Sequence, residues 1–160
     1  MSIHEHGGAS ALLAGFLVLL FVLSFSVLSL LHGWLYMRFV RPAPLGMVLG
    51  FPIAWCFREW SLTWMLTGFP WLLAGYTPMD TWLGGYAPIV GVLGLGIIVA
   101  GEASLIAWCV NNPRPRNISA CVGILAALWS GGWGATKIDF VKPSGKTIAV
   151  SAVQGDIDRM

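Results

Sequence analysis

The hydrophobic residues of the chain are concentrated in four long runs, separated by short segments that contain arginine, proline or aromatic residues. A helix needs about 20 predominantly apolar residues to cross the hydrocarbon core of a bilayer, because backbone groups cannot be left unpaired there. The pattern therefore predicts an all-α polytopic membrane helix bundle within residues 1–136. Its four transmembrane helices are expected at about 9–36, 45–64, 88–110 and 118–135.

The second run is the weakest of the four. Pro52 predicts a kink, and Arg58 and Glu59 fall in its later turns. It is assigned as a crossing mainly because the alternating topology requires one. Charged residues inside a crossing usually face protein or water, although both side chains could instead reach the outer interface if this helix ends early.

The third run carries one acid, Glu102. His32 lies at a comparable depth on the first helix, so one interpretation is a His32–Glu102 contact inside the bundle. The other is that Glu102 meets a water-filled crevice on the cytoplasmic side, and the sequence favours this second interpretation.

Arginines predict the orientation of the helices, since short loops rich in Lys and Arg stay cytoplasmic. Arg38 and Arg41 follow the first run, and Arg114 and Arg116 separate the third from the fourth. Both loops are expected inside. The two chain termini and the connection between the second and third helices are then expected on the outer, periplasmic face.

The polar segment 137–160 differs from the rest of the chain. Within it, Thr147 to Val153 is apolar and β-branched and precedes Gln154 and Gly155, a pattern typical of one strand and a turn. A lone strand cannot pair either of its edges, so we interpret it as the first strand of an incomplete domain.

Composition agrees with a membrane protein. The chain is 57% hydrophobic and 10% charged, against about 25% charged in typical soluble domains. Its net charge of +2 and the absence of long basic runs exclude a nucleic-acid partner. The first residues carry two histidines and an acid where a secretory leader would carry Lys or Arg, so no cleaved leader is expected.

No residue of the chain is predicted to be catalytic, and no metal or cofactor is predicted. His4 and His6 could face the same way in an extended segment, but two ligands are too few for a metal site. Cys56, Cys109 and Cys121 have neither a base beside them nor the spacing of a metal site, so they are expected to be small buried hydrophobic residues.

The connection between the second and third helices is unusually aromatic. Within its residues 67–80 stand Phe69, Pro70, Trp71 and Tyr76 together with two glycines. Trp and Tyr favour the headgroup level of a bilayer and present large rigid apolar faces. These residues are candidates for the lining of a lipid entrance, and the alternative is an ordinary belt of interfacial aromatic residues.

Four blocks of the sequence, in this order, resemble the apolipoprotein N-acyltransferase family of bacterial inner-membrane enzymes. They are "SIHEHGG", "CFREWSLTWMLTGFPWLLAGYTPMD", "YAPIVGV" and "IAVSAVQGDI". Glu59 matches a family position, but the arginine that commonly follows three residues later is Leu62 here. Arg58 lies on the same helical face as Leu62, so it is expected to supply that charge.

The resemblance implies a complete α/β nitrilase-like domain beyond the last block and further helices before the first. It also implies a transfer in which a cysteine, activated by a glutamate and a lysine, takes an acyl chain from phospholipid as a thioester. The N-terminal amine of a diacylglyceryl lipoprotein then accepts the chain. All three residues are expected outside this sequence, so the 160 residues alone are expected to be inactive.

Two other functions stay open at this point. One is a non-enzymatic membrane protein that binds lipid or lipoprotein, and the other is the membrane subunit of a split acyltransferase whose nitrilase-like domain is a separate chain. An apolar strand that ends without a partner counts against both.

Overall fold

A computed structural model of the protein describes residues 8, 10–43, 45–65, 68–141, 145 and 149–153. Among these residues, four helices and several short helical turns make up the regular structure. The helices are α2 (Ala11–Leu35), α3 (Phe51–Leu62), α4 (Ala87–Asn111) and α5 (Pro115–Ala135). π-Helical turns follow α2 and precede α3, and 3-10 turns lie between α3 and α4. These turns are η1 (Tyr36–Val40), η2 (Gly46–Gly50), η4 (Pro70–Leu72), η5 (Ala74–Tyr76) and η6 (Trp82–Tyr86).

Three helical segments are long and apolar enough to cross a membrane: Ala11–Val40, Trp82–Asn111 and Pro115–Ala135. They match the first, third and fourth predicted crossings. The second predicted crossing is a helix, but α3 has only 12 residues. Its end is marked at Thr63, whose hydroxyl donates to the Trp60 carbonyl. The structure thus supports a multi-pass membrane protein with three candidate spans.

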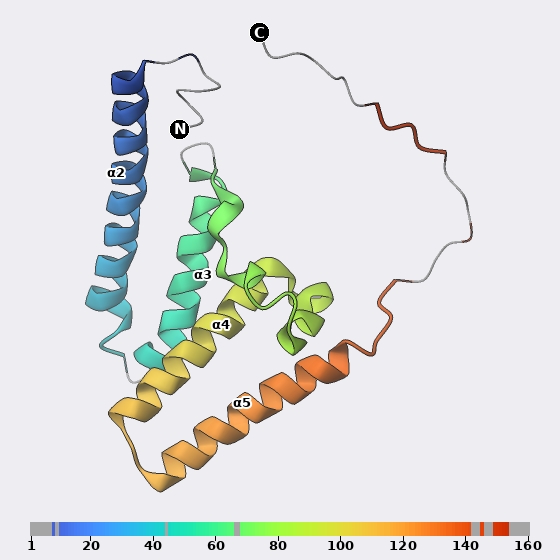
Figure 1. Ribbon diagram of the computed structural model, residues 1–160. Helices are drawn as coiled ribbons and strands as arrows, with labels where there is room; N and C mark the ends of the chain where they lie inside the picture. The colour runs from blue at the N-terminus through green and yellow to red at the C-terminus, as the bar shows by residue number, and fades with distance from the viewer. Residues whose placement is uncertain are drawn as a thin grey trace.

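The helices alternate in direction (Figure 1). α2 and α3 run antiparallel, and α4 and α5 form a second antiparallel pair that crosses α2 steeply. α3 packs mainly on α4, and the 3-10 turns cover the beginning of α4 and the end of α5. The end of α2, the beginning of α3 and the α4–α5 turn lie at the same end of the molecule, which places the four loop arginines there.

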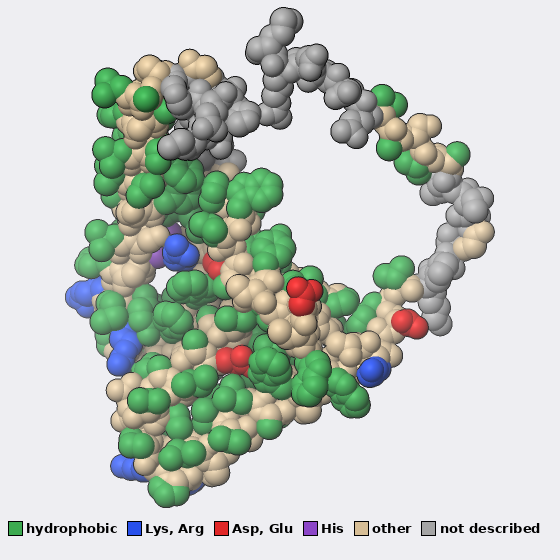
Figure 2. Space-filling view, in the orientation of Figure 1, with side chains coloured by type: hydrophobic (Ala, Val, Ile, Leu, Met, Phe, Trp, Pro, Cys, Tyr) green, Lys and Arg blue, Asp and Glu red, His purple; other side chains and the backbone are tan. Residues whose placement is uncertain are grey.

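Apolar side chains cover most of the visible helix surface, interrupted by few charges (Figure 2). The buried core is small and lies where α3, α4 and the 3-10 turns meet. It contains Leu62, Leu73, Leu83 and Leu95, together with the carboxyl group of Glu59. Most large side chains of α2 are exposed, as expected for a helix that faces lipid.

The predicted strand at 147–153 is not formed in the part that the structure describes. Residues 149–153 have no regular secondary structure and are exposed, and residues 147 and 148 lie outside the described residues. The physical reason is that a strand is stabilised by pairing with a neighbour, and no other strand occurs among the described residues.

Close backbone packing explains two of the glycines between α3 and α4. A Cβ atom at Gly75 would collide with the Val92 carbonyl of α4, and one at Gly85 would collide with the Gly132 carbonyl of α5. Both glycines are buried. The 3-10 turns can therefore lie directly on the helix backbones.

We expect Gly75→Ala to lower the free energy of unfolding by about 1–3 kcal/mol, because the added methyl group overpacks this contact. Gly123→Ala is the matched control. It has open space around the new methyl group, and alanine favours the α5 helix by about 1 kcal/mol. Unfolding in mixed micelles measures both, and equal stabilities of the two variants would contradict the packing account.

Candidate functional site

Residues 68–86, here called the aromatic loop, connect α3 to α4 and form the candidate site. The loop begins at Gly68, whose φ of 86° lies in the left-handed region. The next amide, of Phe69, donates to the Leu62 carbonyl at 2.7 Å. The Phe69 ring then packs edge-on against Phe21 and Phe25 of α2, at centroid distances of 5.1 and 5.3 Å.

Glu59 of α3 holds the middle of the loop. Its side chain is 0% exposed. Oε1 accepts a hydrogen bond from the Ala74 amide at 2.7 Å and another from Trp55 Nε1 at 2.9 Å. A buried carboxylate is costly unless such donors surround it. Glu59 therefore ties the loop to α3 in the same place where Gly75 ties it to α4.

The second oxygen of Glu59 has a different environment. Oε2 is buried and has no hydrogen-bond partner among the described residues. It faces α4, and a Cβ atom at Gly96 would come within 2.7 Å of it. The side chain of Leu62 offers no donor. Gly96 thus leaves space for Oε2 of Glu59, which accepts no hydrogen bond from the described residues.

Contacts with α5 hold the last part of the loop. The Tyr86 hydroxyl donates to the Leu128 carbonyl at 2.9 Å. Leu83 is buried, and the Trp82 ring meets Trp129 of α5 edge-on at 6.4 Å. The loop is therefore attached to all four helices, including α2 through Phe69.

The predicted lipid-entrance residues divide into two pairs. Phe69 and Pro70 are half-buried. Trp71 and Tyr76 are 75% and 55% exposed, and Leu72 beside them is 74% exposed. A firmly attached loop thus presents large apolar side chains at its surface, which is the arrangement that an interfacial role requires.

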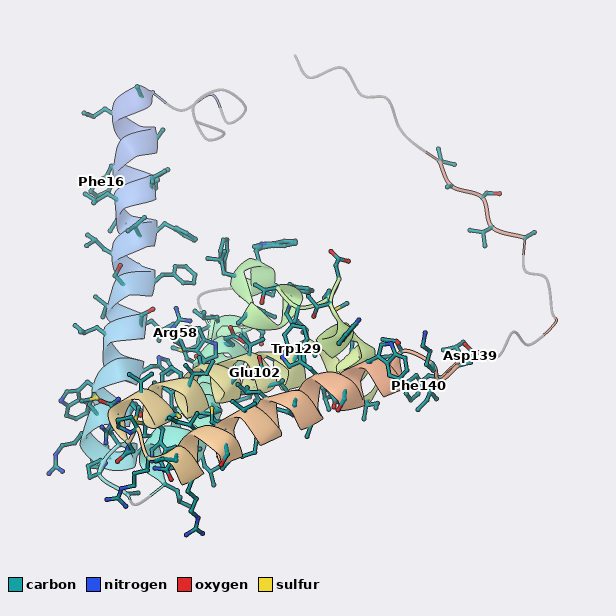
Figure 3. All side chains as sticks on the ribbon, turned by 60° about the horizontal axis from the view of Figure 1, so that its bottom comes forward. Phe16, Arg58, Glu102, Trp129, Asp139 and Phe140 are labelled. Carbon is teal, nitrogen blue, oxygen red and sulfur yellow. The ribbon has the colours of Figure 1, made fainter. Side chains whose placement is uncertain are left out.

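Arg58 does not supply a charge to Glu59. Its Nη2 donates to Ser29 of α2 at 3.1 Å, and the guanidinium lies 5.3 Å from the centroid of the Trp55 ring. Figure 3 places Arg58 between α2 and α3. Arg58 is therefore directed toward α2 and Glu59 toward the loop, with Trp55 in contact with both. The expectation that Arg58 supplies the charge missing at Leu62 is wrong in this structure.

Glu102 contacts α5. Its Oε1 accepts a hydrogen bond from Trp129 Nε1 at 2.9 Å, and the two side chains point toward one another in Figure 3. His32 makes other contacts: Nδ1 donates to the Leu28 carbonyl at 2.7 Å, and Nε2 lies 3.1 Å from the Ser61 hydroxyl. The His32–Glu102 contact considered above is wrong, because the two residues have different partners.

Nothing in the described part of the chain gathers three or more metal-ligating side chains, and His4 and His6 lie outside the described residues. All three cysteines are free thiols. Cys121 is buried as expected, whereas Cys56 and Cys109 are only half-buried.

These features define a multi-pass helical membrane protein with an aromatic loop between α3 and α4. Residues 1–105 match the family model described as apolipoprotein N-acyltransferase N-terminal domain. The chain belongs to this family.

Curated relatives named apolipoprotein N-acyltransferase resemble nearly the whole chain. The proteins from Pseudomonas syringae and Azotobacter vinelandii are each 37% identical over 99% of the chain, which covers 32% and 31% of their lengths. The protein from Coxiella burnetii is 31% identical over 98% of the chain and is covered to 33%. The chain thus spans about a third of the length of these relatives.

We predict that Glu59→Ala speeds hydrogen exchange of the Ala74 amide about tenfold or more, because a hydrogen bond to a charged group contributes about 1.5–3 kcal/mol. Glu59→Gln keeps an acceptor oxygen at Oε1 and should retain most of the protection. Glu102→Ala, an acid without contact to the loop amide, is the control. Unchanged exchange in Glu59→Ala would show that the carboxyl group does not hold the loop.

A double-mutant cycle tests the assignment of Glu102. Glu102→Ala and Trp129→Phe should show a coupling of about 0.6–1.7 kcal/mol in micelle unfolding, the range of hydrogen bonds between membrane helices. Glu102→Ala and His32→Ala should be additive within about 0.5 kcal/mol. Coupling between Glu102 and His32, with additivity between Glu102 and Trp129, would instead support a His32–Glu102 contact.

Proposed function

We propose that this chain is the membrane portion of an apolipoprotein N-acyltransferase, multi-pass in a bacterial inner membrane. Such an enzyme moves an acyl chain from phospholipid to the N-terminal cysteine amine of a diacylglyceryl lipoprotein. The family membership supports this proposal, and the aromatic loop is the observation that carries it. The chemistry itself is assigned to a nitrilase-like domain, of which residues 147–153 would form the first strand and whose catalytic residues would lie outside these 160 residues.

In this proposal the aromatic loop guides lipid. The ester of a membrane phospholipid must reach a reaction centre just outside the bilayer, so the protein needs a rigid apolar surface at the headgroup level. Trp71 and Tyr76 offer that surface because Glu59, Gly75 and Tyr86 fix the backbone that carries them. Phe69 closes the space between the loop and α2.

The positions of the arginines support the proposed orientation. Arg38, Arg41, Arg114 and Arg116 belong to turns at one end of the bundle. With that end cytoplasmic, the loop between α3 and α4 and the chain beyond α5 face the periplasm. The loop and the proposed catalytic domain are then on the same side.

A chimera tests the function. The matching third of the Pseudomonas syringae relative is replaced by this chain, and the product is expressed in cells depleted of their own enzyme. We expect N-acylation of a reporter lipoprotein, detected by mass spectrometry of its N-terminal peptide. A chimera that reaches the membrane and binds the lipoprotein without acylating it would favour the non-enzymatic alternative, and activity restored only by a separate nitrilase-like chain would favour the split enzyme.

In this chimera Trp71→Ala should lower the initial rate of acylation about tenfold, because burying a large side chain against an acyl chain contributes about 1.5–3 kcal/mol. Trp34→Ala removes a tryptophan that is 56% exposed on α2, away from the loop. This control should leave the rate unchanged. Equal effects of the two substitutions would indicate that the loop residues form an ordinary belt of interfacial aromatic residues.

A further inference from the structure

The hairpin formed by α4 and α5 brings two thiols together, and the proposed function uses neither. Cys109 lies in the last turn of α4, and Cys121 lies in the second turn of α5. Residues 112–114 alone connect the two helices, and a connection this short makes them antiparallel neighbours (Figure 1). The two cysteines therefore belong to the same end of one helical hairpin.

Hydrogen bonds hold the hairpin on both sides of the two cysteines. At the turn, the Asn112 amide donates to the Cys109 carbonyl at 3.1 Å, and the Asn117 side chain donates to the Asn112 carbonyl at 2.9 Å. Farther from the turn, Trp129 of α5 donates to Glu102 of α4. The register of α4 and α5 at the cysteines is thus set by contacts that do not involve the thiols.

The two thiols are close to one another but differ in exposure. Their side chains are within hydrogen-bond reach. Cys121 is 5% exposed, whereas Cys109 is half-buried. A small reagent can therefore reach Cys109 first, and Cys121 has to reach only Cys109. An accessible thiol with a second thiol beside it is the arrangement of a redox-active cysteine pair.

We propose that Cys109 and Cys121 form a reversible disulfide that joins α4 to α5, with a disulfide of the glutathione class as the oxidant. The Cys109 thiolate attacks one sulfur of the oxidant, which forms a mixed disulfide and releases one glutathione thiolate. The Cys121 thiolate then attacks the Cys109 sulfur and releases the second. The two cysteine protons pass to the released thiolates, so the products are one protein disulfide and two molecules of reduced glutathione.

The disulfide is a redox-dependent modification of the bundle. In the proposed orientation this end of the hairpin is cytoplasmic, where thiols are kept reduced and a disulfide is transient. Only this assignment of the side depends on the proposed function. The disulfide fixes α5 against α4, and α5 holds the end of the aromatic loop through Tyr86. Oxidation thus acts on the support of the loop and not on the loop itself.

Peptide mapping of the purified chain tests the proposal. The folded chain in neutral detergent is incubated with oxidised glutathione, the remaining thiols are alkylated in SDS, and tryptic peptides are identified by mass spectrometry. Arg58 separates Cys56 from Cys109, and Arg116 separates Cys109 from Cys121, so each cysteine occupies its own peptide. We expect two peptides joined through Cys109 and Cys121, with Cys56 alkylated. Dithiothreitol should return both joined cysteines to the alkylated form.

Three variants separate the steps of the exchange. Cys56→Ser removes the third cysteine and should give the same joined peptides as the wild type. Cys121→Ala removes the second thiol, so Cys109 should stop at the mixed disulfide and carry one glutathione. Cys109→Ser should leave Cys121 unmodified, because a buried thiol has no access to the oxidant.

Each of three results in the folded wild type would overturn the proposal. Alkylation of all three cysteines after oxidation would show that the two thiols do not join. A link to Cys56, or dimers on a non-reducing gel, would assign the disulfide to another pair. Glutathione retained on Cys109 without any joined peptides would make Cys109 a single reactive thiol.

Discussion

The buried carboxyl group of Glu59 is the interaction on which the functional part of the structure depends. One oxygen accepts hydrogen bonds from the Trp55 indole of α3 and the Ala74 amide of the loop, while the other rests against Gly96 of α4. Burying a carboxylate costs several kcal/mol unless donors compensate it. The loop amide is such a donor, so the burial of Glu59 and the folding of the aromatic loop are coupled.

This coupling explains why a loop rich in glycine can present aromatic residues in a defined way. Gly75 and Gly85 bring the loop backbone onto α4 and α5, and the carboxyl group supplies a directional contact between those two points. Trp71 and Tyr76 then extend from an ordered backbone. In the proposed function this order favours binding, because less conformational entropy is lost when an acyl chain binds to a rigid surface.

The long hydrophobic runs predicted the helices well, because three of the runs are long enough to cross a bilayer. The contacts of the site could not be predicted in the same way. Nothing in the pattern indicates that Glu59 reaches the Ala74 amide, or that Glu102 meets Trp129 rather than His32. These partners depend on how helices cross, whereas hydropathy reports only burial along one helix. Glycines such as Gly75 and Gly96 indicate close packing, but the sequence does not show that a buried acid lies between them.

The most direct test of the central claim is the distance between the loop and a helix, measured with spin labels at positions 76 and 118. Tyr76 and Ile118 are both exposed, so the labels need no buried space. If Glu59 orders the loop, the unaltered chain has one narrow distance distribution, which becomes broad in Glu59→Ala. A broad distribution in the unaltered chain, or a narrow one that survives Glu59→Ala, would contradict the claim that this carboxyl group orders the aromatic loop.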